Sequence, residues 1–149
     1  MQFIDLKRQL EHLRPAIEAR ISGVLEHGQF ILGPEVQELE QALADYCGVR
    51  HAIGVANGTD ALQLALMAAD IGPGDAVFTS AFSFFASAEV ISLVGATPVF
   101  VDIDAQSYNI CPNALESAVE AVDSEGKLTP RAIIAVDLFG LPADYPRIK

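Results

Sequence analysis

The chain has 149 residues, of which 51% are hydrophobic and 19% are charged, so it is long and apolar enough to bury a core of the size of one domain. Its 20 acidic side chains outnumber 9 basic ones, and the net charge of -11 disfavours binding to nucleic acid or to anionic membrane surfaces. A phosphate ligand would therefore need a local site built from the backbone.

The cysteines, the histidines and the N-terminal residues argue against metal sites, a disulfide framework and a signal peptide. Cys47 and Cys111 stand far apart without metal-binding spacing, so neither a zinc site nor a disulfide framework is predicted. Residues 1–8 lack the apolar segment of a signal peptide, and no apolar stretch is long enough to span a bilayer, so we expect a cytoplasmic protein. No metal site is expected, and surface or capping roles are predicted for the three histidines, which are His12, His27 and His51.

The first 48 residues are predicted to form an N-terminal helical segment. Apolar residues recur every three or four positions over residues 10–25, which describes one face of a helix. Proline is tolerated only near a helix start, so the pattern fits one helix or two with a break near Pro15. Residues 28–33 are too short for a regular element, and a proline then stands at the favoured first turn of a second helix over residues 34–46.

From residue 49 onward, short apolar runs alternate with helical segments. The predicted strands are residues 52–56, 76–79, 98–101 and 132–136. The predicted helices are residues 60–69, 84–94 and 112–122. This alternation is typical of an α/β domain with a mostly parallel sheet. Because the strands carry few polar residues, we expect helices to cover both faces of the sheet.

The most informative segment is the turn at Gly58, where a predicted strand ends and a helix begins. Free backbone N–H groups at a helix start, together with the Thr59 hydroxyl, can receive a phosphate. Gly58 would let the backbone approach the ligand closely, and Asp60 is a candidate for the helix cap. An ordinary strand-to-helix turn is an equally weighted alternative. A single glycine without a following Lys-Ser/Thr disfavours dinucleotide and ATP binding.

Two other strand ends carry candidate residues. Phe82, Phe84 and Phe85 follow the second predicted strand, at the edge where ligands of open α/β sheets gather. A ring there can stack on a flat cofactor, although burial in the core is the favoured interpretation for each one. Asp102 and Asp104 follow the third strand and could bind a metal or act in acid–base chemistry, although simple turn formation is favoured.

Five segments, taken in order, resemble successive landmarks of one family. They are residues 28–36, 56–62, 72–75, 95–104 and 138–140. By this resemblance the chain is identified as a member of the DegT/DnrJ/EryC1/StrS aminotransferases. The resemblance implies the type I, aspartate-aminotransferase-like fold of enzymes that use pyridoxal 5'-phosphate (PLP). In that fold a large α/β domain precedes a smaller C-terminal domain, so residues 49–149 would form the first part of the PLP-binding large domain.

The resemblance also assigns roles to single residues. Gly58, Thr59 and Asp60 are similar to the turn that holds the PLP phosphate, which agrees with the helix-start argument. Phe84 matches the aromatic residue that stacks on the pyridine ring.

The resemblance also extends to the part of the family's active site that binds the substrate. Residues 3–5 and 28–33 resemble segments near the nucleotide-sugar site, with Phe30 as a candidate substrate contact. Relatives often have a histidine in place of Asp137.

The family's covalent anchor is expected outside this chain. In the family a lysine holds PLP as a Schiff base and an aspartate pairs with the pyridine nitrogen, and both lie beyond the point that corresponds to Lys149. Lys7 and Lys127 do not follow the serine-rich loop of the family's lysine. The 149-residue chain alone is therefore expected to contain no catalytic residue and to be inactive.

The resemblance implies that the parent protein transfers an amino group, from glutamate, to a nucleotide-linked keto-sugar, and that it works as a homodimer whose subunits share each active site. Two alternatives stay open. Some members of the family are PLP-dependent sugar dehydratases in which histidine replaces the lysine. The chain as it stands could also be a non-catalytic binding or assembly module.

Overall fold

The computed structural model describes residues 4–149, so Phe3, part of a segment compared with the nucleotide-sugar site, lies outside the described residues. The chain divides into two compact units, the first ending at Gly54 and the second spanning Val55–Lys149.

The first unit begins with one long helix, α1 (Leu6–His27). The Asp5 side chain accepts a hydrogen bond of 3.1 Å from the backbone N–H of Arg8, and Gly28 ends the helix in a left-handed conformation with φ of 69°, as a C-terminal glycine commonly does. The break considered near Pro15 does not occur. The turn around Pro15 is exposed, so water can solvate the backbone carbonyl that loses its partner there.

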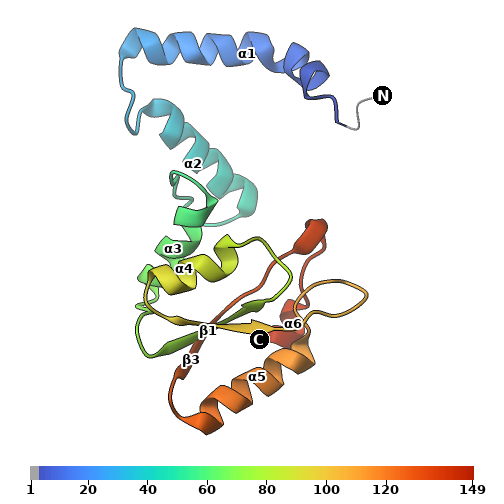
Figure 1. The fold of residues 1–149 in the computed structure, drawn as a ribbon. Coiled ribbons are helices and arrows are strands. Elements are labelled where there is room, and N and C mark those ends of the chain that lie inside the picture. The colour runs from blue at the N-terminus through green and yellow to red at the C-terminus, as the bar shows by residue number, and fades with distance from the viewer. Residues whose placement is uncertain (1–3) are drawn as a thin grey trace. The chain divides into compact units, whose positions relative to one another are not determined.

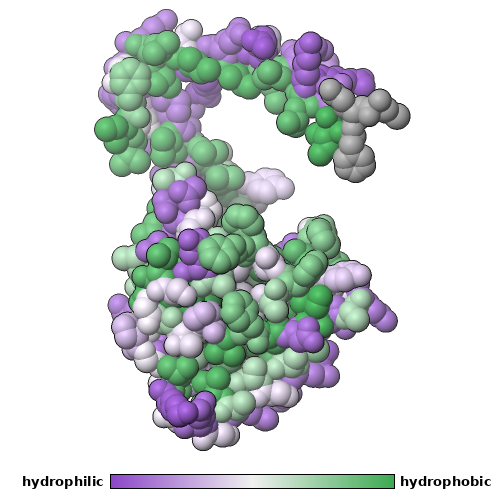
Figure 2. All heavy atoms as spheres, viewed as in Figure 1, coloured by the Kyte–Doolittle hydropathy of each residue, from purple (hydrophilic) through white to green (hydrophobic). Residues whose placement is uncertain are grey.

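A second helix, α2 (Pro34–Cys47), begins as predicted with proline in its first turn and ends at Gly48. An ion pair of 2.7 Å between Arg20 and Glu38 joins the two helices. Along α1, at the top of the view, polar side chains gather on one edge and apolar side chains on the other (Figure 2). No helix among residues 4–149 combines the length and apolarity needed to cross a membrane.

The second unit is built on a parallel sheet of three strands in the order β2-β1-β3. The strands are β1 (Asp75–Ser80), β2 (Thr97–Val101) and β3 (Thr129–Ile134). The central strand β1 pairs in parallel with both neighbours, which confirms the predicted parallel α/β architecture. All three strands therefore end at the same edge of the sheet.

Helices cover both faces of this sheet, as predicted (Figure 1). Val77 of β1 packs in one core cluster with residues of α3 (Gly58–Ala68) and α4 (Ala86–Leu93). The next residue, Phe78, packs in a second cluster with residues of α5 (Pro112–Glu125). The alternation follows from the two-residue period of a strand, which sends successive side chains to opposite faces.

The segment after β3 makes a short 3-10 turn, η1 (Leu138–Gly140), and then enters a last helical turn, α6 (Tyr145–Ile148).

The strand predicted over residues 52–56 is wrong, because this stretch is irregular. Its apolar side chains are not buried, and Ile53 is 80% exposed. A strand needs a neighbour for its backbone hydrogen bonds, and no described strand pairs with this stretch. Local sequence pattern carries no information on whether that neighbour is present.

Candidate cofactor site

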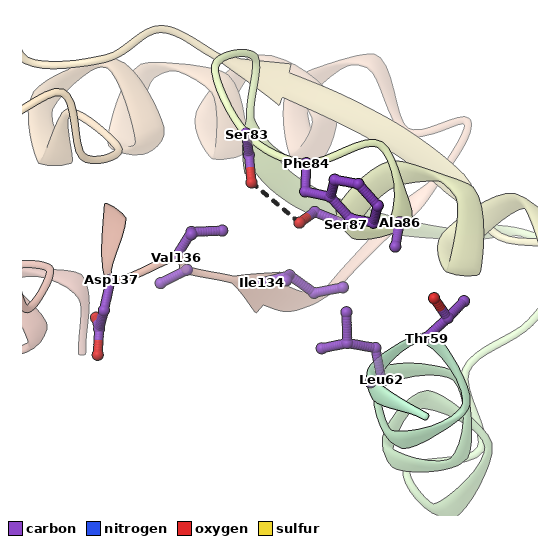
Figure 3. Close-up of a pocket in the computed structure, with 11 residues that line it drawn as sticks. Thr59, Leu62, Ser83, Phe84, Ala86, Ser87, Ile134, Val136 and Asp137 are labelled. Carbon is purple, nitrogen blue, oxygen red and sulfur yellow. Dashed lines mark hydrogen bonds between the residues drawn. The ribbon is translucent and has the colours of Figure 1, made fainter. Parts of the chain in front are cut away.

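A hollow of about 500 Å³ opens in the second unit at the carboxyl ends of the strands. Three separate segments line it: the start of α3 with Gly58 and Thr59, the loop before α4 with Ser83 and Phe84, and the segment from the end of β3 to Asp137. Figure 3 shows these segments facing one another. The fold thus brings together three of the four residues predicted to bind the cofactor.

The start of α3 is capped by Asn57, whereas Asp60 was the candidate for the cap in the sequence. The Asn57 side-chain oxygen accepts a hydrogen bond of 2.9 Å from the backbone N–H of Asp60, and its amide nitrogen donates to the Asp60 carboxylate at 3.1 Å. Asn57 holds this role because it is the last extended residue before the helix, with φ of -164°, which is where a capping side chain belongs. Asp60 supports Asn57 and does not line the hollow.

Two backbone donors remain free at this helix start. The N–H groups of Gly58 and Thr59, and the Thr59 hydroxyl, have no acceptor within residues 4–149. A Cβ added to Gly58 would meet no atom within 4 Å, so the space beside its backbone is open. The N-terminal end of a helix carries partial positive charge and unpaired donors. This end of the hollow can therefore receive a phosphate group.

The predicted burial of the three phenylalanines before α4 is wrong. Phe84 is 79% exposed, Phe85 is 72% exposed and Phe82 is 49% exposed. The segment leaves β1 as a loop in which the Ser80 hydroxyl accepts the backbone N–H of Phe82 at 3.1 Å, so their side chains are not inserted into either core cluster. Of the three, Phe84 lines the hollow and offers a ring face to a flat ligand.

Two serines also line the hollow, and neither was singled out from the sequence. The hydroxyls of Ser83 and Ser87 lie 3.1 Å apart and share a hydrogen bond (Figure 3). Ser87 is 6% exposed. The sequence signal that could have identified them is their separation of four residues, which brings a loop residue next to the first turn of the following helix.

Asp137 is the one charged side chain on the lining of the hollow, and sequence type alone suggested no chemistry for it. One of its oxygens accepts hydrogen bonds from the Ala143 N–H at 3.0 Å and from the Tyr145 hydroxyl at 2.8 Å. These bonds, the Ala143 bond first, hold the pKa of the Asp137 carboxyl below its ordinary value. The bond to Asp137 is the main cause that raises the pKa of Tyr145. Asp137 is therefore ionised at neutral pH. It lies at the opposite end of the hollow from Thr59 (Figure 3).

Among the residues that the structure describes, no lysine or arginine lines the hollow. Lys127 pairs with Glu125, and neither Lys127 nor Lys149 reaches the lining. An anion at this site would be held by backbone N–H groups and hydroxyls, as the strongly acidic composition required.

Asp104 lies in a turn, as favoured from the sequence. Its carboxylate accepts the backbone N–H groups of Gln106 and Ser107 and the Ser107 hydroxyl, at 2.9 to 3.1 Å. These bonds, the Ser107 N–H first, lower the pKa of Asp104. Among residues 4–149, no three potential metal ligands come together.

Phe30 belongs to the first unit and is 69% exposed in the loop between α1 and α2. His27 shapes this loop: its Nδ1 accepts the Gln29 N–H at 3.0 Å, so its Nε2 donates to the Glu35 carboxylate at 3.0 Å. This bond from His27 is the main cause that lowers the pKa of Glu35. The substrate contact assigned to Phe30 stays a prediction.

Comparison with known proteins decides the family. The sequence model of the DegT/DnrJ/EryC1/StrS aminotransferase family matches residues 11–149. The chain belongs to this family. A UDP-2-acetamido-2-deoxy-3-oxo-D-glucuronate aminotransferase of Pseudomonas aeruginosa is 50% identical over 100% of the chain and 40% of its own length.

Solved structures of family members agree. The crystal structure of a DegT/DnrJ/EryC1/StrS aminotransferase from Brucella abortus matches with a TM-score of 0.96 and 56% identity, over 99% of this chain and 40% of that one. A putative sugar aminotransferase from Streptococcus pneumoniae in its PLP form matches with a TM-score of 0.76 and 36% identity, over 88% of this chain and 32% of that one. These likenesses confirm the predicted type I fold. The chain spans about 40% of the length of the relatives from Pseudomonas aeruginosa and Brucella abortus.

Proposed function

We propose that the chain is the first part of a longer PLP-dependent enzyme that transfers an amino group, from glutamate, to a nucleotide-linked keto-sugar. The observation that carries the proposal is the convergence of free donors at Gly58 and Thr59 with the exposed ring of Phe84 in one hollow. Family membership, and a relative named as an aminotransferase of a UDP-linked 3-oxo sugar, support the reaction class.

The residues that line the hollow suit both the phosphate and the ring of PLP. The phosphate would lie at the start of α3, on the N–H groups of Gly58 and Thr59 and the Thr59 hydroxyl. The pyridine ring would lie against Phe84, with Leu62 and Val136 among the apolar lining residues. The negative charge of the phosphate would be stabilised by helix-start donors and hydroxyls alone, since the lining carries no cationic side chain.

The chain's own residues bind and orient, and they do no chemistry. The bound cofactor would supply the electron sink and the carrier for the amino group. Phe84 would cover one face of the ring, and the α3 start would fix the phosphate. A lysine would hold the cofactor and move protons, and we propose that it lies outside the 149 residues, because no lysine among the described residues lines the hollow.

We further propose that the intact protein is a homodimer that works in the cytoplasm on nucleotide sugars for polysaccharide synthesis, without binding nucleic acid or membranes. The acidic net charge of -11 supports the last two points. Light scattering of the purified longer protein tests the subunit count, and a monomer would contradict it.

Spectroscopy of the longer protein tests the proposed function. With PLP it should show a visible absorption band of the bound cofactor, which glutamate abolishes with release of one equivalent of 2-oxoglutarate. A UDP-linked 3-keto-sugar should then restore the band and yield an amino sugar detectable by mass spectrometry. A band that glutamate leaves unchanged would favour a sugar dehydratase, and the absence of PLP binding would favour a binding or assembly module.

A further inference from the structure

Asn109 is a buried polar side chain that does not line the hollow. It is 4% exposed and follows β2 in a loop closed by an antiparallel bridge between Ile103 and Ile110. Its side-chain oxygen accepts the backbone N–H of Leu138 at 3.0 Å, and its amide nitrogen donates to the carbonyl of Leu141 at 2.9 Å. One side chain thus holds both ends of the η1 turn.

The turn held in this way is strained. Phe139 and Gly140 are consecutive left-handed residues, with φ of 56° and 81°, and Phe139 has a Cβ that disfavours this conformation. Phe139 is also 83% exposed, so packing of its ring does not fix the turn. A conformation of this kind persists only where its surroundings over-determine it. The two Asn109 bonds supply that constraint.

The same segment is anchored again on the other side of the turn. Asp137 precedes η1 and accepts the Ala143 N–H and the Tyr145 hydroxyl. Asp137 and the preceding Val136 line the hollow, so the chain leaves the hollow directly into the clamped turn. The position of this wall therefore depends on where Asn109 holds Leu138.

We propose that Asn109 is a positioning residue for the cofactor site, which fixes Val136 and Asp137 at the ring end of the hollow before the cofactor binds. The inference rests on the proposed function, because it assumes that PLP occupies the hollow. Buried side chains that lock the residues touching a ligand commonly set its affinity. No ligand contact by Asn109 itself is required.

The two ends of the hollow can be compared with each other, because Asn109 clamps only one of them. Its phosphate end is built by α3, which Asn109 does not contact through any hydrogen bond within the described residues. Its other end is built by the segment that Asn109 clamps, and Figure 3 shows Thr59 and Asp137 at opposite ends. Loss of the clamp should weaken binding of whole PLP and leave binding of inorganic phosphate unchanged.

Two substitutions separate the halves of the clamp in the longer protein, freed of PLP. Asn109→Ala removes both bonds, and the isosteric Asn109→Asp keeps the acceptor for Leu138 but sets an oxygen against the Leu141 carbonyl. Asn113→Ala is the matched control, because Asn113 also makes a side-chain bond, of 2.6 Å to Arg147, and does not line the hollow. Titrations would give dissociation constants for PLP and for inorganic phosphate.

Asn109→Ala should raise the PLP dissociation constant about tenfold or more, as expected for loss of two buried hydrogen bonds, and Asn109→Asp should also raise it, because two oxygens then face each other in a buried site. The phosphate constant should stay within about twofold of wild type, and Asn113→Ala should change neither. Unchanged PLP affinity in both Asn109 variants would overturn the positioning role. Equal losses of PLP and phosphate affinity in a folded variant would also overturn it, because the clamp would then act on the whole hollow and not on its ring end.

Hydrogen exchange on the wild-type protein decides the point even if a variant fails to fold. The Leu138 and Ala143 amides should exchange slowly without PLP, because Asn109 and Asp137 hold them in the free protein. Fast exchange that slows only when PLP is added would overturn the inference. A wild-type protein that binds no PLP would instead contradict the proposed function, and the positioning role with it, whatever the exchange rates.

Discussion

The Thr59 hydroxyl is the side-chain donor at the phosphate end of the hollow, and it has no partner within the described residues. Thr59→Val keeps the shape of the side chain and removes the donor. Because a hydrogen bond to a charged group contributes about 1.5–3 kcal/mol, PLP affinity of the longer protein should fall by about tenfold or more. Titration of the PLP-free protein measures it. Thr129→Val, an exposed threonine on β3, is the control, and equal affinities in the two variants would contradict the assignment.

Phe84 can be tested against its own neighbour. Phe84→Leu removes the ring that faces the hollow, whereas Phe85→Leu removes an equally exposed ring that does not line it. Because aromatic stacking contributes about 0.5–1.5 kcal/mol beyond burial, Phe84→Leu should weaken PLP binding by several-fold and shift the visible band of the bound cofactor. Phe85→Leu should do neither. Equal effects of both changes would show that neither ring is the stacking wall.

The bond between Asp137 and Tyr145 predicts a pH-dependent contribution to stability. The folded-state pKa of Asp137 is lowered, so its contribution is present above the unfolded pKa and is lost as pH falls through the folded pKa. The folded-state pKa of Tyr145 is raised, so its contribution is present below the unfolded pKa and is lost as pH rises through the folded pKa.

Tyr145→Phe should therefore lower the urea midpoint of the longer protein at neutral pH. The difference should vanish in acid below the pKa of Asp137 and in alkali above the pKa of Tyr145. Tyr46→Phe, at a tyrosine that is 89% exposed, should show no such dependence. A Tyr145→Phe difference that is the same at every pH would contradict the account.

At the scale of the helices, the capping role of Asn57 at the start of α3 can be tested by substitution. Asn57→Ala removes the cap and should destabilise the PLP-free longer protein by about 1 kcal/mol, with weaker phosphate binding because the first turn that carries Gly58 and Thr59 frays. Asn57→Ser keeps an oxygen for the Asp60 N–H and should retain most of both properties. Urea unfolding and phosphate titration measure the two effects. Equal behaviour of the two variants would show that the cap does not organise this turn.

The elements that sequence could predict are those whose signals are local. Pro34 and Pro112 mark helix starts, and each apolar run between turn residues became a strand where a neighbouring strand exists. The run over residues 52–56 has the same pattern without a described neighbour, so pattern alone misassigned it. Pro15 did not break α1, because an exposed turn tolerates the lost bond.

At the site, the turn at Gly58 was predictable for the same reason, whereas Asn109 was not. Its two bonds reach 29 and 32 residues along the chain, and no local pattern encodes a contact of that range. The exposure of Phe84 likewise depends on how the loop leaves β1, which residue type does not reveal.

At the scale of the whole molecule, the proposed function requires that PLP lies in this hollow. The chain spans about 40% of its relatives' length, and its hollow supplies a phosphate end at α3 and a ring wall at Phe84. A crystal structure of the longer protein with PLP tests this most directly. We predict the phosphate within hydrogen-bonding distance of the Gly58 and Thr59 N–H groups and the ring stacked on Phe84. A phosphate bound elsewhere, or a ring without contact to Phe84, would contradict the account.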